Sequence, residues 1–214
     1  PGDFSPATGE RYPLPLTTGV SLLGSGDDNC FLSGDQGSVI ITYFSQESLL
    51  SGFSITSGSD SCIVSEHSTT ELHELTIHHC DSNSNGGGLR ATEGDLILSQ
   101  CHFDSNHSHR QGGGLHASTE AHLNIIECDF TGNTANQHGG GALIGYNGSA
   151  DIIDCVFQNN RANQDGGGLA AYFGITRLAG SQFISNSAGI TGGGIFVTTQ
   201  ESNLGIEPNI FSNN

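Results

Sequence analysis

Apolar and polar residues alternate in short runs along much of the chain. Runs such as 75–77, 96–98 and 123–125 place two aliphatic residues on one side of a short extended segment, as a β-strand requires. A cysteine and a phenylalanine then follow two residues apart, as at Cys101 and Phe103. We expect all four positions to face one interior, with a bend of the chain between the aliphatic pair and the cysteine.

The same unit of 26 to 27 residues repeats between Leu75 and Ile195. Each full copy carries Cys or Ser, then x-Phe-x-x-Asn, then three glycines and a small or aliphatic residue. One unit cannot bury its apolar face alone, so copies must stack. Three adjacent glycines oppose a helix by roughly 1 kcal/mol each. The pattern predicts an all-β fold, a right-handed parallel β-helix of about eight coils spaced ~4.8 Å apart.

We expect one β-helix domain over residues 1–214. Residues 1–74 are predicted to form irregular N-terminal coils, and residues 75–214 the regular repeats.

An asparagine recurs five residues after the cysteine position of each copy. Equivalent residues of stacked coils lie ~4.8 Å apart, so their amides can bond to one another along the stack. The sequence therefore predicts an internal asparagine ladder with a structural role. Its predicted members are Asn85, Asn106, Asn133, Asn160, Asn186 and Asn214.

The six cysteines also follow the repeat. Cys80, Cys101, Cys128 and Cys155 share one predicted inward column, and Cys30 and Cys62 take similar places in two earlier coils. Vertical neighbours fall within the Cα range of a disulfide, which predicts Cys30–Cys62, Cys80–Cys101 and Cys128–Cys155. A buried stack of free thiols is the alternative, because cysteine packs well as a small apolar residue. Zinc binding by cysteines is not expected, since no C-x-x-C spacing is present.

At these motifs the sequence resembles the repeats of chlamydial polymorphic outer membrane proteins, whose signatures are F-x-x-N and G-G-A-[ILV]. The likeness covers about residues 75–214, with the second signature written here as Gly-Gly-Gly-[Leu, Ala or Ile]. The segments 1–4, 8–14 and 19–24 resemble the opening of bacterial pectin-lyase-like domains. The resemblance implies a surface-exposed β-helix, often an adhesin-like passenger.

Charge narrows the choice of partners. The 214 residues include five arginines and 22 acidic residues, for a net charge of -17. This balance argues against binding of nucleic acid or anionic lipid. No apolar run approaches the ~20 residues of a membrane-spanning helix, so no membrane span is expected.

The chain begins at Pro1 and stops at Asn214 without a capping element. We expect it to be part of a longer polypeptide, or to meet copies of itself or flanking domains through open coil ends.

Ten histidines are the main candidates for chemistry. His102, His107 and His109 share one turn region, and histidines on neighbouring strands can bind a metal. Solvated surface histidines are the favoured interpretation, and no metal site is predicted. The remaining histidines of these two coils are His78, His79 and His116.

Acidic side chains offer a second chemistry. An outer patch could hold Ca²⁺ or supply the carboxylate pair of a glycosidase, but the calcium-binding nonapeptide is absent. We predict no cofactor and no catalytic residue, with Ca²⁺ as the alternative. The acidic candidates are Glu127, Asp129, Asp151, Asp154 and Asp165.

One glycosylation sequon is predicted to be usable, at Asn147; the sequon at Asn106 belongs to the inner ladder.

The leading hypothesis is a non-enzymatic, extracellular or cell-surface β-helix that serves as a structural, adhesin-like or fibre-forming module, with glycans or cell-surface molecules as further partners. The alternative is a carbohydrate-binding or polysaccharide-degrading β-helix, for which Tyr146 and Tyr172 are the best-placed tyrosines for an aromatic platform.

Overall fold

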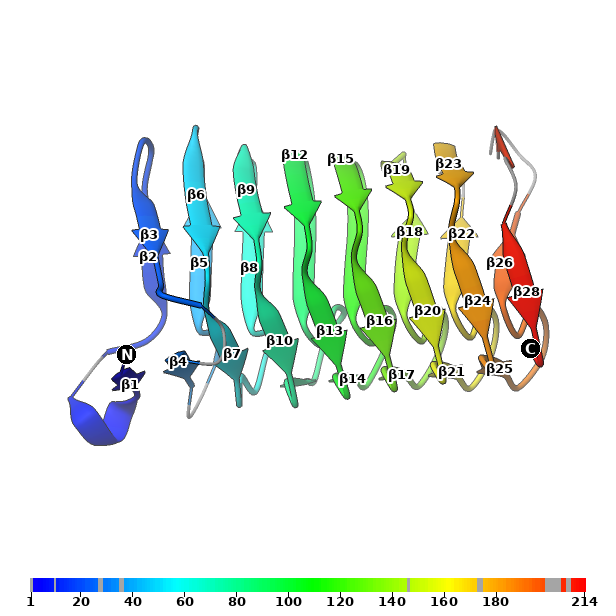
Figure 1. Cartoon of the computed structure of the whole chain (residues 1–214), viewed down its shortest axis with the longest axis horizontal. Coiled ribbons are helices and arrows are strands. Elements are labelled where there is room, and N and C mark those ends of the chain that lie inside the picture. Colours follow the sequence, from blue (N-terminus) through cyan, green and yellow to red (C-terminus); the bar gives the residue numbers. More distant parts are fainter. Residues whose placement is uncertain are drawn as a thin grey trace.

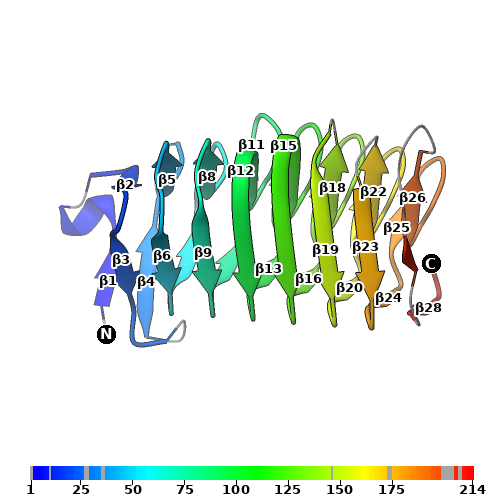
Figure 2. The ribbon, with the colours of Figure 1, turned by 90° about the horizontal axis from the view of Figure 1, so that it is seen from above.

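Successive coils of the chain stack along one axis, and their strands pair in parallel from one coil to the next (Figure 1). The computed structural model describes every residue except 1, 10, 27, 28, 35, 36, 146, 173, 174, 199–204, 207 and 208. The two termini lie at opposite ends of the stack, as both views show (Figures 1 and 2). The predicted parallel β-helix is confirmed.

Three sheets run along the stack, because successive coils add parallel strands to the same walls. The first sheet has nine strands in the order β1-β4-β7-β10-β13-β16-β20-β24-β28. Its strands are Gly2–Phe4 (β1), Cys30–Ser33 (β4), Ser54–Thr56 (β7), Thr76–His78 (β10), His102–Asp104 (β13), Asp129–Thr131 (β16), Val156–Gln158 (β20), Gln182–Ile184 (β24) and Ile210–Ser212 (β28).

The second sheet, which we call the bent sheet, has 14 strands and folds across a corner in each coil. At this corner the pairing of the two longest strands, β12 and β15, contains a β-bulge. The strands before the corner are Leu14–Leu16 (β2), Ile40–Tyr43 (β5), Ile63–Glu66 (β8), Ala142–Gly145 (β18), Leu169–Tyr172 (β22) and Ile195–Val197 (β26). Those after it are Ser21–Leu23 (β3), Ser48–Ser51 (β6), Thr70–His73 (β9), Ser149–Ile153 (β19), Ile175–Ala179 (β23) and Gly205–Ile206 (β27); Leu89–Ser99 (β12) and Leu115–Ile126 (β15) run through it.

The third sheet, which we call the turn sheet, has five two-residue strands just before the glycine runs. They are Asp81–Ser82 (β11), His107–Ser108 (β14), Thr134–Ala135 (β17), Arg161–Ala162 (β21) and Ser187–Ala188 (β25). A 3-10 helix covers Pro6–Thr8.

The glycine runs of successive coils lie in close backbone contact with one another. A methyl group added to Gly140 would lie 2.4 Å from the carbonyl oxygen of Gly167 in the next coil. Since real Cβ atoms do not approach backbone so closely, only glycine fits there.

Stacked phenylalanines fill the interior behind the first sheet. The rings of Phe103, Phe130, Phe157 and Phe183 lie 4.7 Å apart and within 3° of parallel. All four are fully buried. This spacing equals the strand spacing, so the ring stack follows directly from the register.

An asparagine ladder runs beside the phenylalanines. The backbone N–H and the side-chain amide of Asn133 both donate to Oδ1 of Asn160, at 2.9 and 3.0 Å. The amide of Asn133 also donates to the Phe103 carbonyl at 2.8 Å. The same bonds link Asn106, Asn133, Asn160, Asn186 and Asn214.

Asn85 does not belong to this ladder, which corrects the prediction. Asp81 pairs with His107, so Cys80, not Asn85, stands at the position of Asn106. Cys80 continues the ladder only through its backbone N–H, which donates to Asn106 Oδ1 at 3.1 Å. The prediction aligned this copy on its cysteine, whereas strand pairing aligns it on its glycines. Leu75 therefore takes the place of Cys101 one coil earlier, and Cys80 leaves the predicted cysteine column.

The disulfide also differs from the predicted pairs. Cys62 bonds to Cys80, with a Cα–Cα distance of 5.7 Å. Cys62 stands at the position of Gly88, and a Cβ at Gly88 would point at the ladder side chain of the next coil, 3.2 Å from Asn106 Nδ2. The bond thus joins a glycine position to a ladder position.

The predicted pairs Cys30–Cys62, Cys80–Cys101 and Cys128–Cys155 are not formed, and Cys30, Cys101, Cys128 and Cys155 are buried free thiols. The alternative of a thiol stack describes the last three. Cys128 Sγ accepts the backbone N–H of Cys101 at 3.4 Å. The side-chain hydrogen bond between Cys101 and Cys128, together with burial, raises the pKa of Cys101. The Cys101 thiol therefore stays protonated at neutral pH.

Candidate functional site

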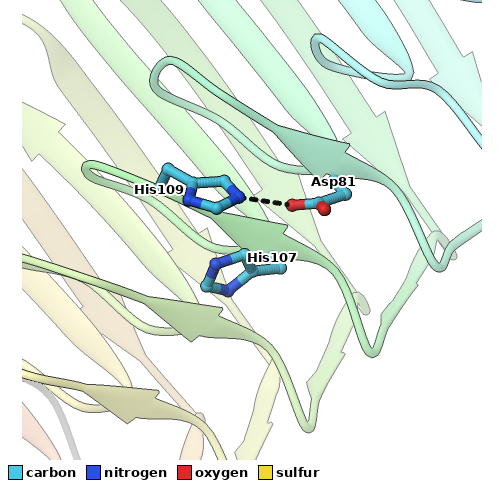
Figure 3. A group of neighbouring side chains, drawn as sticks. All are labelled: Asp81, His107 and His109. Atoms are coloured by element: carbon cyan, nitrogen blue, oxygen red, sulfur yellow. Dashed lines mark ion pairs between the residues drawn. The ribbon is translucent and has the colours of Figure 1, made fainter. Parts of the chain in front are cut away.

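Asp81, His107 and His109 gather on the outer face of the turn sheet (Figure 3). Asp81 and His107 are paired neighbours on β11 and β14, and His109 follows two residues later. His109 Nε2 lies 3.3 Å from Asp81 Oδ1, and the two imidazole rings are 4.7 Å apart. One ligand atom from each residue lies within 4.8 Å of the others. This arrangement can accept a metal ion.

The other histidines of these coils lie apart from this group. His102 is on the first sheet, where its Nδ1 lies 3.1 Å from Asp129 Oδ2. His78 contacts Ser54 and His79, and burial together with the His79 charge lowers the pKa of His78. The predicted grouping of His102 with His107 and His109 is therefore wrong.

A second polar cluster lies where the turn region meets the bent sheet. The Tyr172 hydroxyl is 2.9 Å from Asp165 Oδ2 and 2.8 Å from His138 Nδ1. Burial opposes ionisation of Asp165, but hydrogen bonds from Thr191 and Tyr172 and the nearby His138 outweigh it and lower the pKa of that carboxyl. The side chains of His138 and Asp165 are 18% and 14% exposed, and the adjoining cavity measures only about 80 Å³. The cluster links the turn region to the bent sheet, and the small cavity beside it leaves little room for a substrate.

His116 is buried without a hydrogen-bond partner for either ring nitrogen among the described residues. Burial, and then the positive charge of Arg90, lowers the pKa of His116 to about 4. Its ring is therefore neutral at physiological pH.

A groove of about 540 Å³ crosses the part of the bent sheet after the corner. Polar side chains from four coils line it, including Asp95, His122, Asn124 and Asp151. His122 is oriented by a 2.7 Å hydrogen bond between its Nδ1 and Ser149 Oγ. Such a mixture of carboxylate, imidazole and amide groups suits hydroxyl-rich ligands.

The acidic candidates do not form one patch. Asp151 lines the groove, Asp129 pairs with His102 and Asp165 lies in the tyrosine cluster. Glu127 accepts a hydrogen bond from Gln100 at 3.1 Å; one coil further on, Asp154 takes the equivalent corner position, since the Glu127 N–H donates to Ile153.

Exposed aromatic side chains mark the corner of the bent sheet near the N-terminal coils. Tyr43 and Phe44 are 58% and 59% exposed. The Phe44 ring stacks on His67 at 4.6 Å, and His67 Nδ1 lies 2.6 Å from Glu93 Oε2. We call Tyr43, Phe44 and His67 the aromatic corner; it places exposed aromatic rings beside the carboxylate of Glu93. Tyr146, one of the two predicted platform residues, lies outside the described residues, and Tyr172 is engaged in the polar cluster.

Asn147 is exposed and sits in a turn with a positive φ of 64°, whereas Asn106 is buried in the ladder. The predicted preference for Asn147 as a glycosylation acceptor stays a prediction.

Sequence reasoning missed three groups: Asp81 as a neighbour of His107, the cluster around Tyr172, and the aromatic corner. The contact between Asp81 and His107 could have been predicted from the sequence. Residues 26 positions apart in this repeat are neighbours, and Asp81 precedes His107 by that interval. The other two depend on side-chain directions at corners, where the coil length varies.

Comparison with known proteins places the chain by its fold. A family model described as a right handed beta helix region matches residues 38–211. No curated protein and no solved structure matches the chain. Within the part of the chain that the structure describes, no helix has the length and apolar character needed to cross a bilayer.

Proposed function

We propose that this chain, which belongs to the right-handed β-helix family, is a non-enzymatic module of an extracellular or cell-surface protein. It acts as a stiff, acidic, adhesin-like or structural rod that carries ligand-binding groups on its outer face.

The observation that carries this proposal is the continuity of the interior. The phenylalanine stack and the asparagine ladder run through successive coils and hold them in one register. A disulfide fastens the start of the ladder, and disulfides persist in oxidising, extracytoplasmic compartments. The net charge of -17 favours a soluble surface that repels other anions.

The test combines shape with redox state. Mass spectrometry after thiol alkylation of the denatured, non-reduced protein should find four alkylated cysteines and one Cys62–Cys80 bond. Small-angle scattering should give a rod of about 40 Å that does not shorten on dilution. A fully reduced protein in its native source, or a flexible chain in solution, would contradict the proposal.

Carbohydrate binding is the second candidate, favoured by the aromatic corner. Sugar rings stack on exposed aromatic faces, and the neighbouring Glu93 and the polar groove offer hydrogen bonds to hydroxyls. Asp95 and Asp151 lie two coils and two residues apart along the sheet, about 12 Å between their backbone positions. Both line the groove, where their carboxylates can accept hydrogen bonds from separate hydroxyls of one ligand.

A glycan panel tests this second candidate. Phe44→Ala and Tyr43→Ala should weaken any glycan binding, whereas Ile190→Ser, which also removes an exposed apolar side chain, should leave it unchanged. Equal loss in all three variants, or binding without effect of the first two, would refute a site at the aromatic corner.

Contacts through the coil ends are the proposed route to assembly. An apolar pocket of about 340 Å³ opens among the N-terminal coils, lined by residues such as Phe4, Leu22 and Phe53. Ile210 and Phe211 are exposed on the last described strand. Light scattering of the non-reduced protein should show association that Phe211→Ser weakens; a monomer at all concentrations would exclude self-assembly of this chain.

A further inference from the structure

The repeat register creates the group of Asp81, His107 and His109. Strands β11 and β14 are hydrogen-bonded neighbours, and Asp81 stands directly opposite His107. The His109 N–H donates to the Ser82 carbonyl at 2.8 Å, which holds the second imidazole over the same pair of coils. Figure 3 shows the side chains of His109 and Asp81 pointing toward each other, with the His107 ring beside that of His109. The pairing of β11 with β14 thus fixes the backbone positions from which the three candidate ligands project.

The distances fit a small divalent ion. Ligands bonded to a tetrahedral Zn²⁺ at 2.0–2.1 Å lie about 3.3 Å from one another. The separation of His109 Nε2 from Asp81 Oδ1 is already 3.3 Å. The widest spacing within the group is at most 4.8 Å. Because Asp81 and His109 are exposed, small rotations of their side chains close the remaining gap.

Thr134 orients one of the imidazoles. His107 Nδ1 lies 2.7 Å from Thr134 Oγ1 on the next strand, β17. When Nδ1–H donates to this hydroxyl, the lone pair of Nε2 is left for a metal. Such supporting hydrogen bonds fix the tautomer and the ring direction of metal-bound histidines. The other exposed histidine–aspartate pair, His102 with Asp129, has no third ligand, because the described residues contain one group of three and His102 is not in it.

We propose that Asp81, His107 and His109 form a surface site for a divalent transition metal of the Zn²⁺, Ni²⁺ or Cu²⁺ class. Two imidazoles and one carboxylate suit these borderline ions and not Ca²⁺, which takes six to eight oxygen ligands. Water completes the coordination, since the group is open to solvent. The bound ion bridges two adjacent coils and therefore stabilises the turn sheet against local opening.

Calorimetric titration of the metal-free protein with ZnCl₂, and separately with CaCl₂, tests the site. Zn²⁺ should bind with a stoichiometry of one and raise the midpoint of thermal unfolding, and Ca²⁺ should not compete. His109→Gln and Asp81→Asn should each abolish saturable binding. Thr134→Val, which keeps the side-chain shape but removes the hydroxyl, should weaken binding about tenfold. His102→Gln is the matched control and should bind Zn²⁺ like the parent.

Circular dichroism of each variant checks that the fold persists, which the exposure of the replaced side chains favours. For Cu²⁺, electron paramagnetic resonance of the parent should show nitrogen hyperfine splitting that is reduced in His109→Gln. Absence of saturable Zn²⁺ binding in the parent would overturn the proposal. So would equal losses in His102→Gln and His109→Gln, which would indicate nonspecific binding to surface histidines.

Discussion

Replacement of Asn133 by alanine tests whether the ladder stabilises the fold. The side chain is fully buried and makes four hydrogen bonds. Its Oδ1 accepts from the backbone N–H and the amide of Asn106, both at 3.0 Å. Its amide donates to Phe103 and to Asn160. Alanine removes all four and introduces no replacement.

The expected loss of stability follows from the polar groups that Asn133→Ala leaves without a partner. The Asn106 N–H loses its acceptor where water does not reach, and a buried unmet donor costs about 1–3 kcal/mol. The other lost bonds bring the total to about 2–5 kcal/mol. This is a large share of a domain stability of about 5–15 kcal/mol. Asn133→Asp should cost at least as much, because a carboxylate cannot donate to Phe103 and is buried without a cation.

Denaturant unfolding followed by circular dichroism measures this loss, and Asn136→Ala is the matched control. Asn136 belongs to the same coil, is exposed, and makes one long contact of 3.5 Å to Asn163, so its loss should stay within about 0.5 kcal/mol. Hydrogen exchange should also accelerate at the Asn106 N–H. If Asn133→Ala and Asn136→Ala lose the same stability, the ladder bonds do not hold the coils together.

Three further predictions concern other residues that affect the stability of the stacked coils. The double variant Cys62→Ser, Cys80→Ser removes the disulfide, which closes a loop with a sequence separation of 18. Its free energy of unfolding, measured with denaturant under non-reducing conditions, should be about 3 kcal/mol lower than that of the parent. No difference from the parent would mean that the bond is absent in solution. His116 has a pKa of about 4 in the fold and ~6.5 in the unfolded chain, so stability should be full above pH 6.5 and fall by about 3 kcal/mol as the pH decreases to 4. His116→Leu should flatten this slope, and an unchanged slope would assign it to other groups. Gly140→Ala, whose Cβ would meet the Gly167 carbonyl at 2.4 Å, should cost about 1–3 kcal/mol or more. Gly2→Ala, at a position without a positive φ and with the nearest neighbour of its Cβ at 3.4 Å, should cost less; equal thermal midpoints would show that the turns can spread.

The regular part of the fold could be predicted because one physical rule repeats in it. Glycine runs, a phenylalanine and an asparagine at fixed spacing determine the coil, and the ladder from Asn106 to Asn214 follows from that spacing. The prediction failed at the first copy, where Cys80 replaces the ladder asparagine. Two equally short motifs competed there, and strand pairing follows the glycines because the close backbone contacts tolerate no shift.

The disulfide and the outer groups depend on directions that a linear pattern does not contain. Cys62 reaches Cys80 because two different columns converge at the turn, whereas same-column cysteines such as Cys101 and Cys128 engage the backbone instead. The early coils are also shorter, since Ile55 pairs with Ile77, 22 residues on, and Ile77 with Phe103, 26 residues on. A change of coil length moves the corners, and so Tyr43 and Phe44 could not be placed from the repeat.

The phenylalanine column gives this protein an optical property of its own. Its parallel rings, 4.7 Å apart, are identical chromophores in a fixed one-dimensional array, and their transitions couple at this distance. The sequence contains no tryptophan and four tyrosines, so the sharp phenylalanine bands of the near-ultraviolet are not masked by indole absorption. The circular dichroism of these bands should therefore change when neighbouring coils lose their register, and no label has to be attached to the chain.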